Sequence, residues 1–302
     1  MSERMKNRRA VEVMAASVLA VLLIAAPRMG AQAQPEDKSV PDRAELLKIK
    51  PDMGGFRHGI SIEPDPIDFA DHTGYTSIFD GKTLTGWDGQ PDLWKVEDGA
   101  IVGETKPEMF PPHAFPNTFL ILRGVQAKDF DLKLEIKVEK GGGSGIQYRS
   151  TTLTPEQITT RKASPGRDPR WAMIGPQADF WYPVSDEARQ FSGQLYSQNN
   201  YRGTIVWRGQ VVQSFAGKIP QLVGNIGDRA ALGAFVKDGE WNEYTIIARG
   251  GVILHILNGQ LMAVLVDDDP VSSNNISGVF GLQIEGVPCK VSFRNLWLKK
   301  IN

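Results

Sequence analysis

Alternation of apolar and polar residues is the strongest pattern in this chain, and it begins near residue 75. The segment 130–139 reads FDLKLEIKVE, in which every second residue is apolar and the residues between them are charged. Because side chains alternate between the two faces of a β-strand, this period of two predicts a strand with one face on a core and the other in water. The segments 279–285 and 291–298 are predicted to form two further strands near the end of the chain.

A β-hairpin is predicted at residues 252–266. Two apolar segments, 252–257 and 260–266, are separated only by Asn258-Gly259, and these residue types readily adopt the positive φ angles of a type I′ turn. No segment after Tyr75 sustains a helical period over three turns. Many short strands with Gly, Asp and Pro between them predict an all-β fold, an antiparallel β-sandwich of the jelly-roll type.

The N-terminus has a different composition. Four basic residues lie within positions 4–9, an apolar run follows at about 13–26, and Ala31-Gln32-Ala33 supplies a small-x-small cleavage site. This order is typical of a secretory signal peptide, and the apolar run is shorter than the roughly 20 residues that a membrane-spanning helix needs. A membrane anchor is the alternative. We expect cleavage after Ala33 and an exported protein, periplasmic or extracellular.

Three regions are therefore expected along the chain. Residues 1–33 form the signal peptide, and residues 34–74, rich in Pro, Asp and Lys, form an extended N-terminal arm with no more than one helical turn. Residues 75–302 form the jelly-roll domain.

Charge and cysteine content exclude several classes of function. With 34 Lys and Arg against 35 Asp and Glu, the chain has no basic surplus for nucleic acid, and we expect no membrane partner once the signal is removed. The single Cys289 excludes an intrachain disulfide. The four histidines lack zinc-site spacing, so no metal or cofactor is expected, although the exposed run Asp267-Asp268-Asp269 leaves a divalent cation open. The oligomeric state is not predicted.

Residues 141–149 read GGGSGIQYR and invite comparison with a phosphate-binding loop. Such a loop lies between a strand and a helix and ends in Lys followed by Ser or Thr, whereas here a strand pattern follows and lysine is absent. We expect the glycines to form a wide hairpin corner between strand 130–139 and strand 145–149. Alternation then places Gln147 and Arg149 on one face of the second strand.

Short motifs follow one another over residues 75–301: FDGKTLTGW (79–87), WKVEDG (94–99), DFDL (129–132), GGxSGIxYR (141–149), GPQAD (175–179), GQLY (193–196), WNEY (241–244), His255 before Asn258-Gly259, and GLQIE (281–285). The resemblance that these motifs and their order carry is to a known family, long called domain of unknown function 1080 and described as 3-keto-glucoside lyase/hydratase or 3-keto-disaccharide hydrolase. It implies a concanavalin-A-like jelly roll that binds sugar on the concave face of one sheet. By analogy, the implied substrate is a 3-keto-glucoside or 3-keto-disaccharide.

The implied chemistry has three requirements. A ketone at C3 acidifies the proton at C2, so its removal lets the C1 substituent leave, and water can then add to the unsaturated sugar. The site needs a base near C2, a hydrogen-bond donor or cation at the C3 oxygen, and an acid near the leaving oxygen.

The face pattern of the predicted strands nominates candidates for these parts. Asp179, Glu285 and His255 are the candidate acids and bases, and Arg149 is a candidate for holding the ketone oxygen or orienting a carboxylate. Many family members carry histidine where Glu285 stands, and a glutamate base would need a pKa raised by burial. The candidate substrate-binding residues are Gln147, Gln177, Gln283, Tyr196 and the tryptophan platforms Trp171 and Trp181.

Each candidate also has a plain structural interpretation. Asp179 could cap a turn, Glu285 could be an exposed charge at a strand end, Arg149 could form an ion pair, and His255 could be a core histidine. Two other functions therefore stay open. One is a carbohydrate-binding module without catalysis, and the other is a conventional glycosidase that uses Asp179 and Glu285 as its two carboxylates.

Overall fold

The computed structural model describes residues 67–111, 116–160, 168–182, 191–199, 203–272 and 274–301. The predicted signal peptide at 1–33 lies outside the described residues, as does the predicted arm up to residue 66. In the described part of the chain, no helix is long and apolar enough to cross a membrane.

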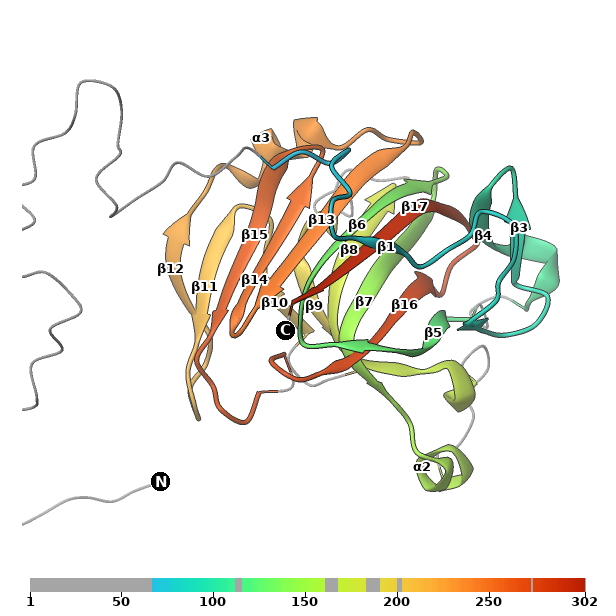
Figure 1. Ribbon diagram of the computed structural model, residues 1–302, viewed down its shortest axis with the longest axis horizontal. Coiled ribbons are helices and arrows are strands. Elements are labelled where there is room, and N and C mark those ends of the chain that lie inside the picture. The colour runs from blue at the N-terminus through green and yellow to red at the C-terminus, as the bar shows by residue number, and fades with distance from the viewer. Residues whose placement is uncertain are drawn as a thin grey trace, which may run out of the picture. The chain divides into compact units, whose positions relative to one another are not determined.

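Two stacked β-sheets make up the described domain (Figure 1). The larger sheet runs in the order β12 (Gln221–Asn225), β11 (Gln210–Ser214), β15 (Gln260–Asp267), β14 (Val252–Leu257), β13 (Asn242–Arg249), β6 (Asp129–Val138), β17 (Cys289–Ile301), β4 (Ala100–Thr105) and β3 (Trp94–Glu97), with β1 (Thr76–Ser77) paired to β17. The smaller sheet runs in the order β10 (Gly203–Val206), β9 (Leu195–Gln198), β8 (Met173–Tyr182), β7 (Gly142–Thr152), β16 (Gly278–Ile284), β5 (Thr118–Ala127) and β2 (Trp87–Asp88).

The strand pairing confirms the predicted jelly-roll sandwich. Among the described strands, every pair is antiparallel except β11 with β15, which is parallel. Within the described ranges, helical structure is limited to the short segments α2 (Pro155–Thr160), α3 (Arg229–Leu232), η1 (Pro107–Met109), η2 (Pro169–Trp171) and η4 (Gly233–Phe235).

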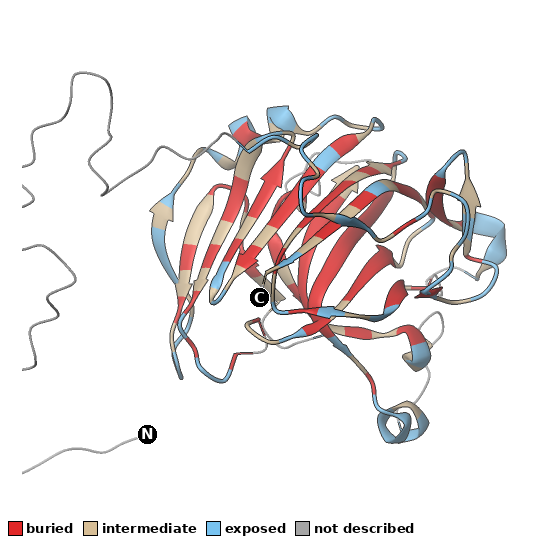
Figure 2. Cartoon of the chain, viewed as in Figure 1, coloured by how far each residue is buried: buried red, intermediate tan, exposed pale blue. Residues whose placement is uncertain are grey.

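The core lies between the two sheets, and the alternation of β6 shows how it forms. The five apolar residues of this strand, Phe130, Leu132, Leu134, Ile136 and Val138, are all buried, as the red bands across the sheets in Figure 2 illustrate. Lys133 breaks the pattern because it is buried on the outward face. Its Nζ donates to the carbonyls of Asp68 and Asp71, which brings the chain entering the domain across β6.

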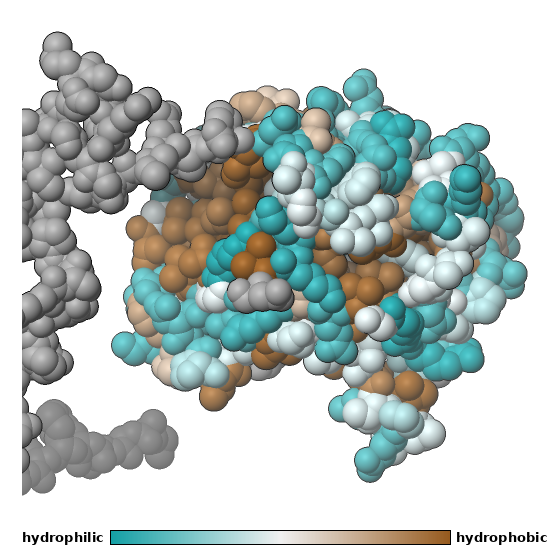
Figure 3. Space-filling view, in the orientation of Figure 1, coloured by the Kyte–Doolittle hydropathy of each residue, from teal (hydrophilic) through white to brown (hydrophobic). Residues whose placement is uncertain are grey.

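The predicted hairpin is confirmed at β14 and β15. Asn258 and Gly259 have φ angles of 50° and 78°, the positive values that a type I′ turn requires. The outward face of this hairpin is not polar: Leu254 and Val264 pair across it half-buried, and Figure 3 shows apolar side chains exposed over β11, β14 and β15.

The glycine segment does not form the predicted hairpin corner. The strand β7 begins at Gly142, so most of the glycines lie inside it and pair with β8. The strand β6 belongs to the ten-stranded sheet and β7 to the seven-stranded one, so the chain turns at Gly141, where φ is 96°, and crosses between sheets. The strand needs glycine at Gly143 and Gly145 because side chains of β8 lie directly against them.

Candidate active site

Two glycines of β7 provide a strand surface without side chains. A Cβ at Gly143 would lie 2.6 Å from the indole of Trp181, and a Cβ at Gly145 would lie 2.1 Å from Nε2 of Gln177. Such separations are far inside van der Waals contact, so both positions require glycine. The indole and the amide, which come from β8, therefore lie flat against β7 and form the floor of a hollow.

This hollow, the polar pocket, has a volume of about 450 Å³ and opens on the outward face of the seven-stranded sheet. It is lined by Asn117, Gln177, Asp179, Trp181, Phe191, Gln194, Tyr196, Gln198, Asn199, Thr204, Trp207 and Glu285. The strands β8, β9 and β10 supply half of these residues, because pairing sets Gln177 beside Tyr196 and Tyr196 beside Thr204 on the same face.

A one-way chain of amide hydrogen bonds runs beneath the pocket. Ser150 Oγ donates to Gln147 Oε1 at 2.5 Å, and Gln147 Nε2 donates to Gln177 Oε1 at 2.9 Å. At Gln177 the chain divides, since Nε2 donates both to Asp179 Oδ1 at 2.8 Å and to Gln283 Oε1 at 2.7 Å.

The second branch of this chain ends on Glu285. Gln283 Nε2 donates to Asn117 Oδ1 at 3.1 Å, and Asn117 Nδ2 donates to Glu285 Oε1 at 2.7 Å. All the N–H groups therefore point toward two carboxylates, Asp179 and Glu285. In a buried setting, hydrogen bonds aligned in this way strengthen one another.

Asp179 lies in an environment that favours its neutral form. The residue is 5% exposed, and burial raises the pKa of its carboxyl from 3.8 to about 8, with a further rise from the charge of Glu285. Donation from Gln177 and from Gln194 Nε2 at 2.6 Å opposes the rise in pKa and does not overcome the burial. Near neutral pH this carboxyl therefore keeps its proton.

Glu285 occupies a different environment at the same pocket. The side chain is half-buried, and its Oε1 accepts from Asn117 Nδ2 and from the backbone N–H of Gly286 at 3.1 Å. The backbone N–H of Glu285 donates to the carbonyl of Gly143 at 3.3 Å, which fixes the residue beside β7. One pocket thus holds a buried, protonated carboxyl and a second carboxyl near solvent.

Aromatic rings form one wall of the pocket. Phe191 contacts the edge of Trp181 with ring centroids 5.7 Å apart and lies 6.1 Å from the ring of Trp207. The guanidinium of Arg229 lies 3.9 Å from the Trp207 ring centroid on a cation–π contact. This wall offers the flat apolar surface on which the C–H face of a sugar packs.

Most of the residues predicted from alternation come together at this pocket. Gln177, Asp179, Trp181, Tyr196 and Glu285 line it. Gln147 and Gln283 are fully buried and lie in the amide chain beneath it, so they orient the lining residues rather than reaching the hollow.

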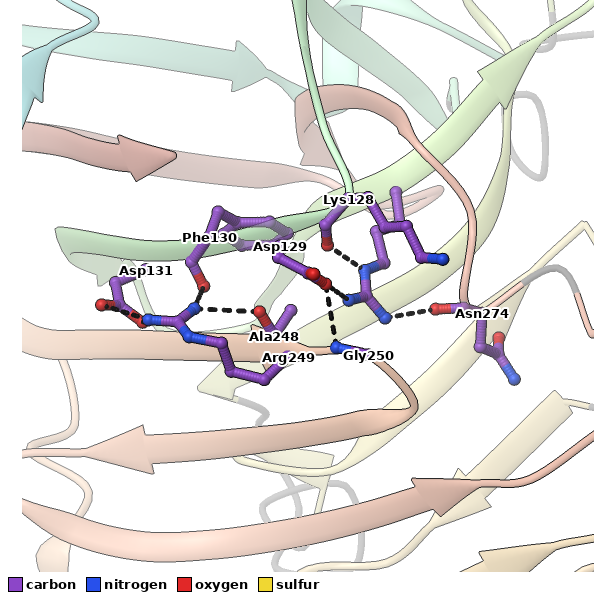
Figure 4. Close-up of polar contacts among 9 residues, drawn as sticks. Lys128, Asp129, Phe130, Asp131, Ala248, Arg249, Gly250 and Asn274 are labelled. Atoms are coloured by element: carbon purple, nitrogen blue, oxygen red, sulfur yellow. Dashed lines mark hydrogen bonds and ion pairs between the residues drawn. The ribbon is translucent and has the colours of Figure 1, made fainter. Parts of the chain in front are cut away.

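Arg149 does not share the face of Gln147, and that prediction is wrong. The pairing of β7 with β8 shifts register between Gln147 and Thr151, and Arg149 takes a φ of 45°, so this bulge interrupts the alternation. The buried guanidinium donates to the carbonyl of Lys128 at 2.5 Å, to the carbonyl of Asn274 at 2.9 Å and to Asp129 at 3.0 Å (Figure 4). Arg149 therefore holds two loops together and does not line the pocket.

His255 also lies away from the pocket, in the core between the sheets. Its Nε2 lies 2.7 Å from the hydroxyl of Tyr148 and its Nδ1 lies 3.2 Å from the carbonyl of Gln194. The carbonyl can only accept, so Nδ1 carries the proton and Nε2 accepts from Tyr148. Burial lowers the pKa of His255 to about 4, which keeps the ring neutral, and the ring anchors the backbone of the residue that binds Asp179.

Two further predictions are corrected. Trp171 does not form a platform in the pocket but packs in a separate apolar cluster with Phe119 and Met173. The run at 267–269 is not an exposed acidic turn, since Asp267 and Asp269 are buried and take part in hydrogen bonds within their own loop. In the described ranges, no cluster of three or more His, Cys, Asp or Glu side chains is arranged to hold a metal ion.

Several lining residues were not predicted. Gln194 belongs to the GQLY motif, but no role was predicted for it, although its amide donates directly to Asp179. Trp207 lies in a tight turn before β11, and Asn117 enters from the segment before β5, so neither lies on a strand whose alternation could assign a face.

Comparison with known proteins identifies the relatives of this chain. The model of the 3-keto-alpha-glucoside-1,2-lyase-like domain matches residues 74–299. A 3-keto-disaccharide hydrolase of Bacteroides thetaiotaomicron is 29% identical over 201 residues, which cover 63% of this chain and 58% of that protein. The match therefore spans somewhat under three fifths of the relative's length.

Solved structures of similar shape are more distant. A protein of Bacillus subtilis with a galectin-like fold is 12% identical, with a TM-score of 0.47 and coverage of 72% of this chain and 90% of that one. A carbohydrate-binding module of Bacillus subtilis is also 12% identical, with a TM-score of 0.40 and coverage of 71% and 96%. Neither likeness bears on function.

Proposed function

This chain belongs to the 3-keto-alpha-glucoside-1,2-lyase-like domain family, and from that membership and the pocket we propose that it is an enzyme that cleaves 3-keto-glycosides. The substrate is a 3-keto-glucoside or 3-keto-disaccharide, and the reaction is elimination followed by hydration. The observation that carries the proposal is the pair of unlike carboxylates, Asp179 and Glu285, in one pocket.

The elimination proceeds through an enolate. A base removes the proton at C2, and the electron pair moves into the C2–C3 bond while the C3 carbonyl becomes an enolate. As the carbonyl re-forms, a double bond forms between C1 and C2, and the bond from C1 to the leaving oxygen breaks. The leaving oxygen takes a proton from an acid. Water then adds its oxygen to C1 and its proton to C2, so the net result is hydrolysis.

The two environments suggest which carboxylate takes which part. Glu285 lies near solvent and serves as the base at C2, while Asp179, protonated near neutral pH, donates to the departing oxygen. Two titratable groups whose surroundings separate their proton affinities are the usual arrangement for a paired acid and base. We expect the aromatic wall to pack against the apolar C–H face of the sugar ring.

A carbohydrate-binding module without catalysis would not need this arrangement. Holding a neutral carboxyl beside a second carboxylate costs stability, and such perturbed pairs are concentrated at catalytic sites. A conventional glycosidase would also use two carboxylates, and it differs from the proposed enzyme in having no requirement for the ketone.

The test compares substrates with and without the ketone. Purified protein is incubated with methyl 3-keto-glucoside and with unoxidised methyl glucoside, and released methanol is measured. We expect release from the ketone only. Release from both would indicate a conventional glycosidase, and binding of the ketone without release would indicate a binding module; either result would overturn the proposal.

Variants test the roles of the two carboxylates. Asp179→Asn and Glu285→Gln should each lower kcat/KM by about 10²- to 10⁴-fold, the usual contribution of a positioned acid or base. Glu97→Gln, on the exposed edge strand β3 and outside the pocket, is the matched control and should turn over normally. Unchanged turnover in either pocket variant would remove that residue from the mechanism.

We further propose that the protein is exported, on the basis of the signal-like sequence at 1–33. Expression of the full chain in a Gram-negative host, followed by fractionation and N-terminal sequencing, should find mature protein in the periplasm or medium that begins at Gln34. Uncleaved protein in the cytoplasm would contradict this proposal.

A further inference from the structure

A second hollow adjoins the polar pocket at the edge of the smaller sheet. This side pocket has a volume of about 660 Å³ and is lined by Thr204 and Ile205 of β10, the turn 217–220, Asp269 and Val271. Thr204 lines both hollows. The two hollows are therefore neighbours at β10.

The side pocket differs from the polar pocket in the chemistry of its walls. Ile205, Ile219, Pro220 and Val271 present mostly aliphatic surface, and among the described lining residues Lys218 is the cation and Asp269 the anion. Ile219 and Val271 are 84% and 86% exposed, and these values are high for large apolar side chains. An apolar surface held open to water beside a reaction pocket is typical of a binding site.

Hydrogen bonds hold the walls of the side pocket in place. Asp267 Oδ2 accepts from Ser272 Oγ at 2.5 Å and from Asn274 Nδ2 at 2.9 Å, and Asp269 Oδ1 accepts from the backbone N–H of Val271 at 3.1 Å. Arg149 fixes the far end of the same loop by donating to the carbonyl of Asn274. Val271 is thus exposed between residues that these hydrogen bonds hold in place.

The opposite wall is tied to this loop. The backbone N–H of Asp268 donates to the carbonyl of Ser214 at 3.0 Å, and Gln213 Nε2 donates to Asp268 Oδ2 at 2.5 Å. Ser214 ends β11, directly before the turn that carries Ile219. Both walls are therefore preorganised, which reduces the entropy that a ligand loses when it binds between them.

We propose that the side pocket binds an apolar, aromatic aglycone of the 3-keto-glycoside while the sugar occupies the polar pocket. This inference rests on the proposed function and specifies its substrate class. A second sugar unit would need hydrogen-bonding groups on all sides, whereas Ile205, Ile219, Pro220 and Val271 make half of the described lining aliphatic. A planar aromatic group of two fused rings fits within the hollow and can pack against its apolar walls.

The test measures kcat/KM for two substrates, 4-methylumbelliferyl 3-keto-glucoside and methyl 3-keto-glucoside, on wild type and on Val271→Asp and Ile219→Asp. Both residues are on the surface, so the variants should fold. Each should lower kcat/KM for the methylumbelliferyl substrate by about 5- to 20-fold, through KM, and leave the methyl substrate within twofold. Leu222→Asp is the matched control, since Leu222 is 62% exposed on β12 and does not line the side pocket.

The outcomes separate the two proposals. If the methyl substrate is turned over but the variants leave the methylumbelliferyl substrate unchanged, or lower both substrates equally, the side-pocket inference is wrong and the proposed function stands. If neither substrate is turned over, the proposed function is wrong. In that case, fluorescence titration with free 4-methylumbelliferone decides the inference: weaker binding by Val271→Asp than by Leu222→Asp supports an apolar binding site, and equal binding overturns it.

Discussion

Replacing Asp179 with asparagine should change how the stability of the protein depends on pH. In the folded protein, burial raises the pKa of this carboxyl from 3.8 to about 8, so the folded state keeps a proton that the unfolded chain releases near pH 4. Because the folded state binds more protons in this window, the free energy of unfolding must fall as pH rises from about 4 to about 8. The asparagine variant has no proton to release at this position.

The size of the effect follows from the two pKa values. Between them, each pH unit changes the free energy of unfolding by about 1.4 kcal/mol for one titrating group. Between pH 5 and pH 7, wild type should therefore lose about 2.7 kcal/mol relative to Asp179→Asn. Above about pH 8 the difference should stop growing, since Asp179 is then ionised in both states.

Urea denaturation of both proteins at pH 5, 6, 7 and 9 measures the difference between their free energies of unfolding. The slope of this difference against pH does not depend on any constant offset that the substitution causes. The control is Asp80→Asn, because backbone hydrogen bonds from Thr83 and Lys82 lower the pKa of the exposed Asp80, and its charge does not change above pH 5. A difference between wild type and Asp179→Asn that is flat from pH 5 to 7 would show that Asp179 is ionised in the fold, and its role as acid would be wrong.

Three further predictions concern other parts of the structure. Gly145→Ala should lower kcat/KM at least tenfold, because the new methyl group displaces the amide of Gln177, while circular dichroism should show the β-sandwich retained. His255→Leu should lower the free energy of unfolding by about 2–4 kcal/mol in urea, because the Tyr148 hydroxyl and the Gln194 carbonyl lose their partner inside the core. In wild type, the stability that neutral His255 contributes should be present above about pH 6.5 and lost as pH falls toward about 4, and NMR should find its ring titrating near 4. Arg149→Lys should lower the free energy of unfolding by about 2–3 kcal/mol, since an ammonium cannot bond both loop carbonyls and Asp129 from one place, and unchanged urea midpoints would contradict this.

Much of the fold could be predicted from the alternation of apolar and polar residues along the sequence. The strand 130–139 and the hairpin at Asn258-Gly259 were predicted because local alternation and turn chemistry determine them. The crossing from β6 to β7 was not, because alternation shows that a strand exists and not which sheet it joins. Glycines inside a strand resemble a turn until the groups lying on them, here from β8, are known.

For the site, alternation predicted the faces of residues only where the strands are regular. Gln177 with Asp179, and Gln283 with Glu285, were correctly placed on shared faces because their strands are regular over those residues. Arg149 was misplaced because it lies within a bulge that shifts the register between Gln147 and Thr151, and no residue type in the sequence indicates this bulge. Gln194 was missed because its importance comes from a contact with Asp179, which only the folded pairing of distant segments creates.

The single orientation of the amides beneath the pocket means that the two carboxylates are not independent. Both depend on the same upstream amide, since the orientation of Gln147 sets that of Gln177, from which both branches run. A 180° flip of any one of these side-chain amides would place two oxygens or two N–H groups face to face. The amides of the chain must therefore flip together or not at all. The donors that face Asp179 and Glu285 therefore share one orientation, which is set on β7 and not at either carboxylate.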